Sequence, residues 1–261
     1  MSSCGRVIIS ASLRACGFTP RQARFLMLVL EHSGVCLPRQ YRRFAGVAHG
    51  RHTHRFFEKL ITGGFATTDL AAPAHAGRIY HVQYKPWYRA LGEADHRHRK
   101  PVGVGRAVER LMVLDGVLAE PNIMWLGLSR DKIATFTNAP WCVPPDALPQ
   151  TTIDGVVRPF PDPFPIGLSP DGSCRFLYLV TTPFPTAFRA FLTRHVALLS
   201  ALRSWRLRLL LPPALSDARN MYIRTVHQVL EPVVGDGVET HVELVPVTQS
   251  YLRLERLVGT A

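Results

Sequence analysis

The chain has 261 residues, 47% of them hydrophobic, and a formal net charge of +12. The apolar content excludes a disordered chain, and no run of residues reaches the roughly 18 consecutive apolar residues of a membrane span. The first hundred residues contain 16 of the 31 basic residues and 5 of the 19 acidic residues, so they carry +11 of the net charge. This concentration of positive charge predicts a domain that binds a polyanion.

The five cysteines are odd in number and widely spaced, and no CxxC motif occurs. This pattern predicts free thiols and favours neither a disulfide framework nor a zinc ribbon. The apolar segment after Arg6 is too short for a signal peptide. A cytoplasmic protein without a membrane partner is therefore expected.

The first predicted helix begins at Thr19 and Pro20, because a hydroxyl cap followed by proline is typical of a helix start. It extends to about His32. Pro38 opens a second, shorter helix that ends near Ala45 before Gly46. This second helix carries three basic residues, Arg39, Arg42 and Arg43.

A third helix is predicted after Gly50, because apolar residues recur at helical spacing at Phe56, Phe57, Leu60 and Ile61. Two glycines end it, and residues 65–68 and 78–84 then predict two strands of a hairpin. Three helices followed by a hairpin predict a winged helix-turn-helix domain over residues 1–92.

In such a domain the start of the third helix lies near base edges, while the second helix and the wing contact phosphates. Double-stranded DNA is therefore the predicted partner. The predicted base-contacting residues are Arg51, His52, Thr53, His54 and Arg55, and His49 before them is also predicted to bind DNA. The predicted phosphate contacts are Arg39, Arg42, Arg43, Lys59 and Arg78. The alternative is that these charges form a solvated helical face.

Histidines form two HxH pairs in this half, at His52 and His54 and at His96 and His98. No acidic or cysteine partner occurs at a matching spacing, although zinc sites usually need four ligands. Solvated or phosphate-contacting imidazoles are predicted instead. No metal site and no cofactor are predicted.

Residues 93–101 are polar and basic and end at a proline, which is typical of a linker that also touches DNA. Residues 102–261 are predicted to form a second domain. Its expected helices are 106–119, 186–202 and 216–230, and its expected strands are 131–137, 164–168, 175–181, 205–211 and 238–245. The order α-β-β-β-α-β-α-β predicts an α/β core.

That order resembles the PD-(D/E)xK nuclease superfamily, which has a restriction-endonuclease-like core. In that superfamily an Asp precedes one strand and the motif ExK lies on the next strand. Pro161-Asp162 matches the position of the Asp. The resemblance implies a divalent metal held by carboxylates, with a lysine that assists water or the phosphate. Here the ExK positions are Leu179, Val180, Thr181 and Thr182, and no lysine follows Lys132. No catalytic residue is therefore predicted, and Asp162 is expected to be a turn or cap residue.

A winged helix followed by a degenerate nuclease-like domain resembles the replication-relaxation family of bacterial plasmids and integrative elements. The similar segments are 19–91 and 106–212, in particular the element from Phe56 to Phe65, and Pro161-Asp162 with the strand at Phe176. The resemblance implies DNA binding tied to replication or transfer of a mobile element.

The predicted function is thus a non-enzymatic, double-stranded-DNA-binding protein, either a transcription regulator or a replication or transfer accessory factor. Its C-terminal domain is expected to form a homodimer or to recruit a protein partner. Two alternatives remain open. One is a metal-dependent DNA nuclease centred on Asp162 with Asp154 or Asp171, and the other is a winged-helix adaptor that binds RNA or protein.

Overall fold

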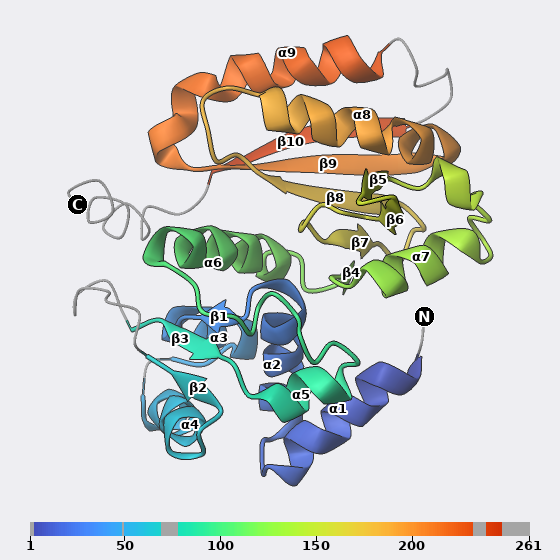
Figure 1. The fold of residues 1–261 in the computed structure, drawn as a ribbon. Helices are drawn as coiled ribbons and strands as arrows, with labels where there is room; N and C mark the ends of the chain where they lie inside the picture. The colour runs from blue at the N-terminus through green and yellow to red at the C-terminus, as the bar shows by residue number, and fades with distance from the viewer. Residues whose placement is uncertain (1–2, 49, 69–77, 232–238, 247–261) are drawn as a thin grey trace. The chain divides into compact units, whose positions relative to one another are not determined.

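The computed structural model describes residues 3–48, 50–68, 78–231 and 239–246. The protein is mixed α/β, and its internal contacts divide it into two compact units. The N-terminal unit extends to Pro121, and the C-terminal unit begins at Asn122. Figure 1 draws the elements of both units as a ribbon.

The N-terminal unit combines helices with one small antiparallel sheet. Its helices are α1 (Ser3–Ala15), α2 (Pro20–His32), α3 (Pro38–Ala45), α4 (Arg51–Thr62), α5 (Lys85–Ala90) and α6 (Val104–Leu118). Its strands are β1 (Val35–Cys36), β2 (Ala66–Thr67) and β3 (Tyr80–Val82). The sheet order is β1-β3-β2, in which Val35 lies opposite His81 and Ala66 opposite Val82.

Local sequence signals explain where α2 and α3 begin and end. At the start of α2 the Thr19 hydroxyl accepts a hydrogen bond from the Gln22 amide at 3.3 Å, and the Gln22 side chain accepts one from the Thr19 amide at 3.0 Å. Helix α3 ends at Gly46, whose positive φ of 62° suits glycine. The helices predicted at residues 20–32 and 38–45 are confirmed.

Aromatic side chains form the core of this unit. Tyr41 of α3 stacks on Phe56 of α4 with ring centroids 4.3 Å apart, and Phe65 stacks on Trp87 of α5 at 4.6 Å. Phe18 meets the rings of both Phe56 and Trp87 edge-on. This packing joins α3, α4 and α5 in one hydrophobic core.

The boundary between the units differs from the predicted one at residues 101 and 102. Helix α6 packs against α2, α3 and β1, so it belongs to the N-terminal unit. The predicted linker 93–101 is also packed into that unit, because the His98 side chain is buried. The sequence shows that this segment is polar and ends in proline, which is typical of a linker. It does not show that backbone groups of the unit bind a histidine of the segment. Helix α1, which was not predicted, packs against α2 and α5.

The C-terminal unit is built on a five-stranded mixed sheet. Its helices are α7 (Ser129–Thr137), α8 (Thr186–Ala201) and α9 (Arg219–Leu230). Its strands are β4 (Met124–Leu126), β5 (Gln150–Ile153), β6 (Val156–Pro159), β7 (Ile166–Leu168), β8 (Cys174–Leu179), β9 (Ser204–Leu211) and β10 (Glu239–Pro246). The order is β10-β9-β8-β7-β4, with β8, β9 and β10 parallel and the others antiparallel, while β5 and β6 pair separately.

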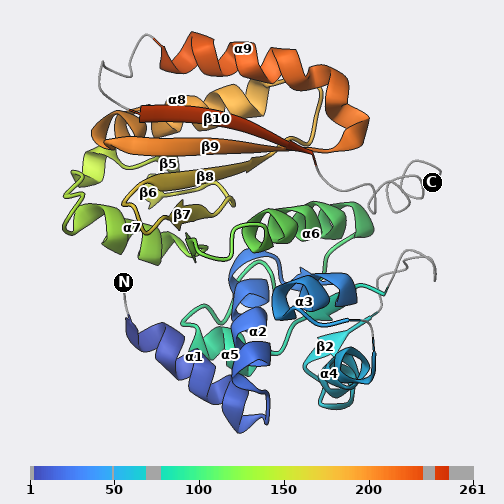
Figure 2. The same ribbon diagram turned by 180° about the vertical axis from the view of Figure 1, so that it is seen from behind.

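Helices α8 and α9 lie on the same face of this sheet, as the two opposite views show (Figure 1 and Figure 2). Between them and the sheet lies a hydrophobic core that includes Phe176 and Tyr178 of β8, Phe188 of α8 and Tyr222 of α9. Alternate residues of β8 and β9 face this core, as expected for strands packed against helices. The strands predicted near 164–168, 175–181, 205–211 and 238–245 are confirmed.

One predicted strand is wrong. Residues 131–137 form most of helix α7, because Lys132, Thr135 and Phe136 are buried at helical spacing. The alternation of Ile133, Thr135 and Thr137 imitates a strand over this short segment. The cysteines whose side chains are described, Cys16, Cys36, Cys142 and Cys174, are all free.

Candidate nucleic-acid interface

Helix α4 divides sharply into a buried face and an exposed basic face. Thr53, Phe56, Phe57 and Leu60 are buried. The exposed residues at its N-terminal end are Arg51, His52, His54 and Arg55. The apolar residues recur at spacings of three and four, so the helix turns the four polar side chains away from the core.

The start of α4 is electrostatically unusual. Gly50 provides no side-chain cap, and no acidic residue occurs in the first turn. Arginines therefore lie at the positive end of the helix dipole, which is unfavourable for an isolated helix and favourable for a bound anion. Packing of Phe56 and Phe57 must hold this helix in place, because its own termini contribute little.

Two more predicted DNA-binding residues belong to this segment. His49 lies outside the described residues. Thr53 is only 5% exposed, and its hydroxyl has no hydrogen-bond partner within the described part of the chain. The prediction for Thr53 is wrong because its position, three residues before Phe56, turns it toward the core.

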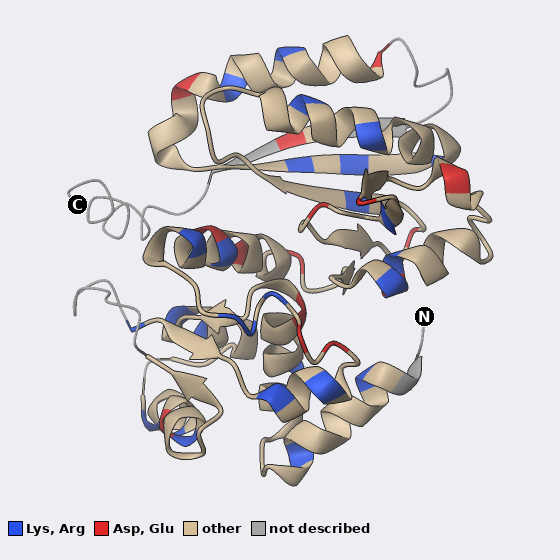
Figure 3. Cartoon of the chain, viewed as in Figure 1, with Lys and Arg blue, Asp and Glu red and all other residues tan. Residues whose placement is uncertain are grey.

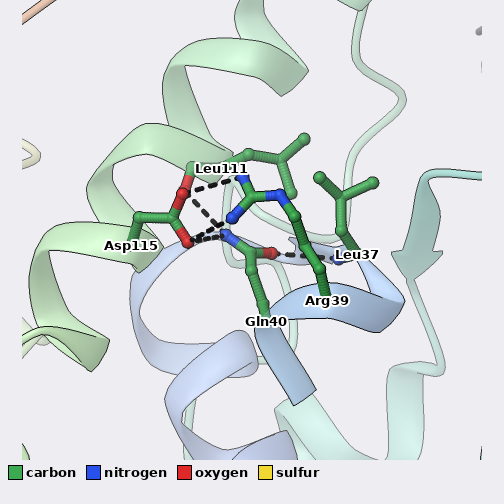
Figure 4. Close-up of polar contacts among 5 residues, drawn as sticks. All are labelled: Leu37, Arg39, Gln40, Leu111 and Asp115. Carbon is green, nitrogen blue, oxygen red and sulfur yellow. Dashed lines mark hydrogen bonds and ion pairs between the residues drawn. The ribbon is translucent and has the colours of Figure 1, made fainter. Parts of the chain in front are cut away.

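Arg39 is also engaged inside the unit (Figure 4). Its Nη1 and Nη2 donate to Asp115 Oδ1 and Oδ2 of α6 at 3.2 and 2.8 Å. Gln40 Nε2 donates to Asp115 Oδ1 and to the Leu111 carbonyl, both at 2.9 Å. Gln40 Oε1 in turn accepts from the Leu37 amide at 2.9 Å. Arg39 thus fixes α3 to α6, and its predicted role as a phosphate contact is corrected.

Lys59 is likewise a structural residue. Its Nζ donates to the Gly17 carbonyl at 2.6 Å and lies 4.6 Å from the centre of the Phe18 ring. These contacts hold α4 against the turn between α1 and α2. The predicted phosphate contact at Lys59 is therefore replaced by a bond within the fold, because the Gly17 carbonyl holds the ammonium group.

The remaining predicted phosphate contacts lie at the surface. Arg43 is exposed, and Arg42 is partly buried. Arg78 is exposed just before β3 and hydrogen-bonds to Tyr80. Burial raises the pKa of Tyr80, and Arg78 acts in the opposite direction. Basic positions occur on α3, on α4 and at the start of β3 (Figure 3).

The second HxH pair is not solvated as predicted. His98 is buried, and its Nδ1 donates to the Leu30 carbonyl at 3.1 Å, since a carbonyl oxygen only accepts. The Nε2 of buried His81 donates to the His98 carbonyl at 2.8 Å. Burial, together with the charges of His96, Arg97 and Arg110, lowers the pKa of His98 well below its ordinary value. His98 is therefore a neutral core residue.

The carboxylates of the C-terminal unit have separate local roles. Asp162 pairs with Arg194 of α8 through bonds of 2.7 and 3.2 Å, so it is an ion-pair residue rather than the predicted turn or cap. Asp171 accepts bonds from the amide and hydroxyl of Ser173, and Asp154 occupies the turn between β5 and β6. Among the described residues, no three or more His, Cys, Asp or Glu side chains gather as a metal site.

Comparison with models of protein families, with curated proteins and with solved structures found no match. None of the helices described in residues 3–231 is long and apolar enough to cross a membrane.

Proposed function

We propose that the N-terminal unit is a winged helix-turn-helix that binds double-stranded DNA through α4. The order α2-β1-α3-α4-β2-β3, with an antiparallel sheet in the order β1-β3-β2, supports this proposal. In this arrangement α4 enters the major groove with its N-terminal residues near the bases, and β2 and β3 are the strands of the wing.

The observation that carries the proposal is the exposed basic end of α4. Arg51 and Arg55 are four residues apart, so they lie on one face of the helix, and both are exposed. Arginine is suited to guanine, because its guanidinium donates to O6 and N7 together. Arg43 and Arg78 supply phosphate contacts from neighbouring elements.

The C-terminal unit then serves as a scaffold for dimerisation or for a protein partner. Asp162, the carboxylate on which a nuclease would depend, is held by Arg194. Together with the resemblance to the replication-relaxation family, this supports a regulator or a replication or transfer accessory factor of a mobile element, without a catalytic role.

The test begins with the full chain and a pool of random duplexes, from which bound fragments are selected and sequenced. A shared motif is expected, and a palindrome would indicate a two-fold dimer. A double variant, Arg51→Ala with Arg55→Ala, should lose about 30-fold or more in affinity for that motif, since each bidentate base contact is worth about 1–3 kcal/mol. The matched control replaces Arg203 and Arg219, which are exposed in the C-terminal unit.

Normal affinity in the Arg51 and Arg55 variant would refute α4 as the recognition helix. Equal competition by RNA or single strands would instead favour the adaptor hypothesis. Cleavage of duplex DNA in Mg²⁺ that is lost in Asp162→Asn would favour the nuclease.

A further inference from the structure

A second concentration of arginines lies away from α4, where the segment 93–101 meets α6. Arg106 and Arg110 are one turn apart on α6 and so lie on one face of that helix. Arg110 Nη2 donates to the Arg97 carbonyl at 3.2 Å, which joins the two segments. Arg97, Arg106 and Arg110 therefore lie in one region although they come from two separate parts of the sequence.

Carboxylates offset this charge only in part. Arg106 pairs with Glu109, whereas Nη1 of Arg110 is buried and has no hydrogen-bond partner in the described part of the N-terminal unit. Arg99 lies nearby in the sequence and pairs with Asp95 at 3.2 Å, so it is not counted in the cluster of Arg97, Arg106 and Arg110. The Arg106–Glu109 pair is largely exposed to solvent, so an external phosphate can compete with Glu109 for the Arg106 guanidinium. The buried Nη1 of Arg110 is out of reach of such an acceptor.

The three charges are close enough to repel one another. Desolvation, followed by the charges of Arg110 and Arg106, lowers the pKa of Arg97 to about 10. Desolvation also lowers the pKa of Arg110, where Tyr88 and Glu109 act against this effect and Arg106 acts with it. Such repulsion is costly without an anion, and binding an anion removes the cost.

We propose that Arg97, Arg106 and Arg110 bind a phosphate group of a nucleic-acid backbone. Guanidinium forks match phosphate oxygens in two-bond geometry, and solvent reaches both Arg97 and Arg106. The charge of +11 over the first hundred residues favours a polyanion over an isolated carboxylate. This inference rests on the proposed function, to which it adds a second contact region.

The cluster lies on a different side of the unit from the proposed base-contacting helix. Helix α4 packs against β2, and α6 packs against β1 at the opposite edge of the three-stranded sheet. The proposed phosphate contact is therefore separate from the α4 site and is tested separately.

The test measures how the affinity of the full chain for a mixed-sequence duplex depends on salt. Each phosphate contact contributes about one to the slope of log affinity against log salt. Arg106→Gln should reduce the slope by about one, and Arg106→Gln with Arg110→Gln by up to about two. Arg89→Gln is the matched control, because Arg89 is exposed in the same unit outside the cluster.

An unchanged slope in both cluster variants, with normal binding by the wild type, would overturn this site and leave the proposed function intact. If the double variant unfolds by circular dichroism, Arg106→Gln alone decides, since the Arg106 side chain is 66% exposed. If the wild type fails to bind duplex, the proposed function falls, and inorganic phosphate is titrated while arginine side-chain NMR signals are followed. Shifts that disappear in the variants would support a phosphate site of another source, and their absence would refute it.

Discussion

At the scale of single residues, Asp115 is a carboxylate that joins two helices of the N-terminal unit. It accepts bonds from Arg39 and Gln40, which are neighbours on α3, although 75 or more residues separate them from it in sequence. Its side chain is 9% exposed, against 27% for Arg39. A carboxylate so placed satisfies donors that would otherwise be stranded near the core.

Asp115→Ala is therefore expected to lower the free energy of unfolding by about 3 kcal/mol, since it leaves a guanidinium without its buried partner. Asp95→Ala is the matched control, because it breaks an Asp–Arg pair whose carboxylate is 83% exposed. That control should cost less than about 1 kcal/mol. Urea denaturation of both variants provides the comparison, and similar losses would contradict the structural role of Asp115.

His195 provides a prediction for pH. Burial is the main cause that lowers its pKa to about 4, and its Nδ1 donates to the Phe191 carbonyl at 2.8 Å. In the unfolded chain the pKa is about 6.5, so between about pH 6.5 and 4 the unfolded state binds more protons than the folded state. As the pH is lowered from about 6.5 to 4, the free energy of unfolding should therefore decrease, and His195 should account for about 3 kcal/mol of that decrease.

His195→Asn removes this titration and keeps a donor for the Phe191 carbonyl. Unfolding measured at several pH values should show a shallower decline for the variant between pH 6.5 and 4. Parallel pH profiles for variant and wild type would show that His195 does not contribute.

At the scale of elements, α4 combines weak local signals with strong packing. Gly50 has extended backbone, with φ of 168°, and a Cβ built there meets nothing within 4 Å. An acidic cap is therefore sterically allowed although the sequence does not use one. The missing cap is consistent with a surface selected to bind an anion.

Gly50→Asp should stabilise the protein by about 0.5–1 kcal/mol through capping and the helix dipole. The same change should weaken DNA binding, because it places a negative charge beside the phosphates. Gly50→Ser caps without charge and is the control, with a gain of a few tenths of a kcal/mol and unchanged affinity. Thermal unfolding and gel shifts measure the two effects, and tighter binding by Gly50→Asp would contradict the proposed interface.

Elements with local signals were predictable, whereas long-range partners were not. The threonine cap and the prolines identify α2 and α3, and the stripe at Phe56 and Phe57 identifies α4. The pairing of Arg39 with Asp115 has no local signature, so the sequence suggested a surface arginine. The hairpin of β5 and β6 does have a local signal, since Asp154-Gly155 is a favoured hairpin turn.

At the scale of the whole molecule, the charge asymmetry coincides with two compact units but not with the predicted boundary. Helix α6 completes the N-terminal unit, because Leu111 and Leu114 are buried and Asp115 binds α3. The helix expected at 106–119 in the second domain therefore belongs to the N-terminal unit.

A fragment of residues 1–121 should unfold cooperatively, whereas a fragment of residues 1–101 should not fold. The shorter fragment lacks α6, so it exposes the apolar residues that α6 covers and leaves Arg39 without Asp115. Chemical denaturation followed by circular dichroism compares them. Cooperative folding of the shorter fragment would show that the N-terminal unit does not need α6, as the prediction of a linker at residues 93–101 implies.

The junction between the units has a consequence for recruitment. Only residues 119–123 separate the end of α6 from the start of β4, a span of at most about 20 Å. If the proposed function holds, a protein bound by the C-terminal unit would be linked through this short segment to the DNA-binding unit, and such short links give effective concentrations in the millimolar range. A weak partner, too dilute to reach that DNA unaided, would then act on it efficiently.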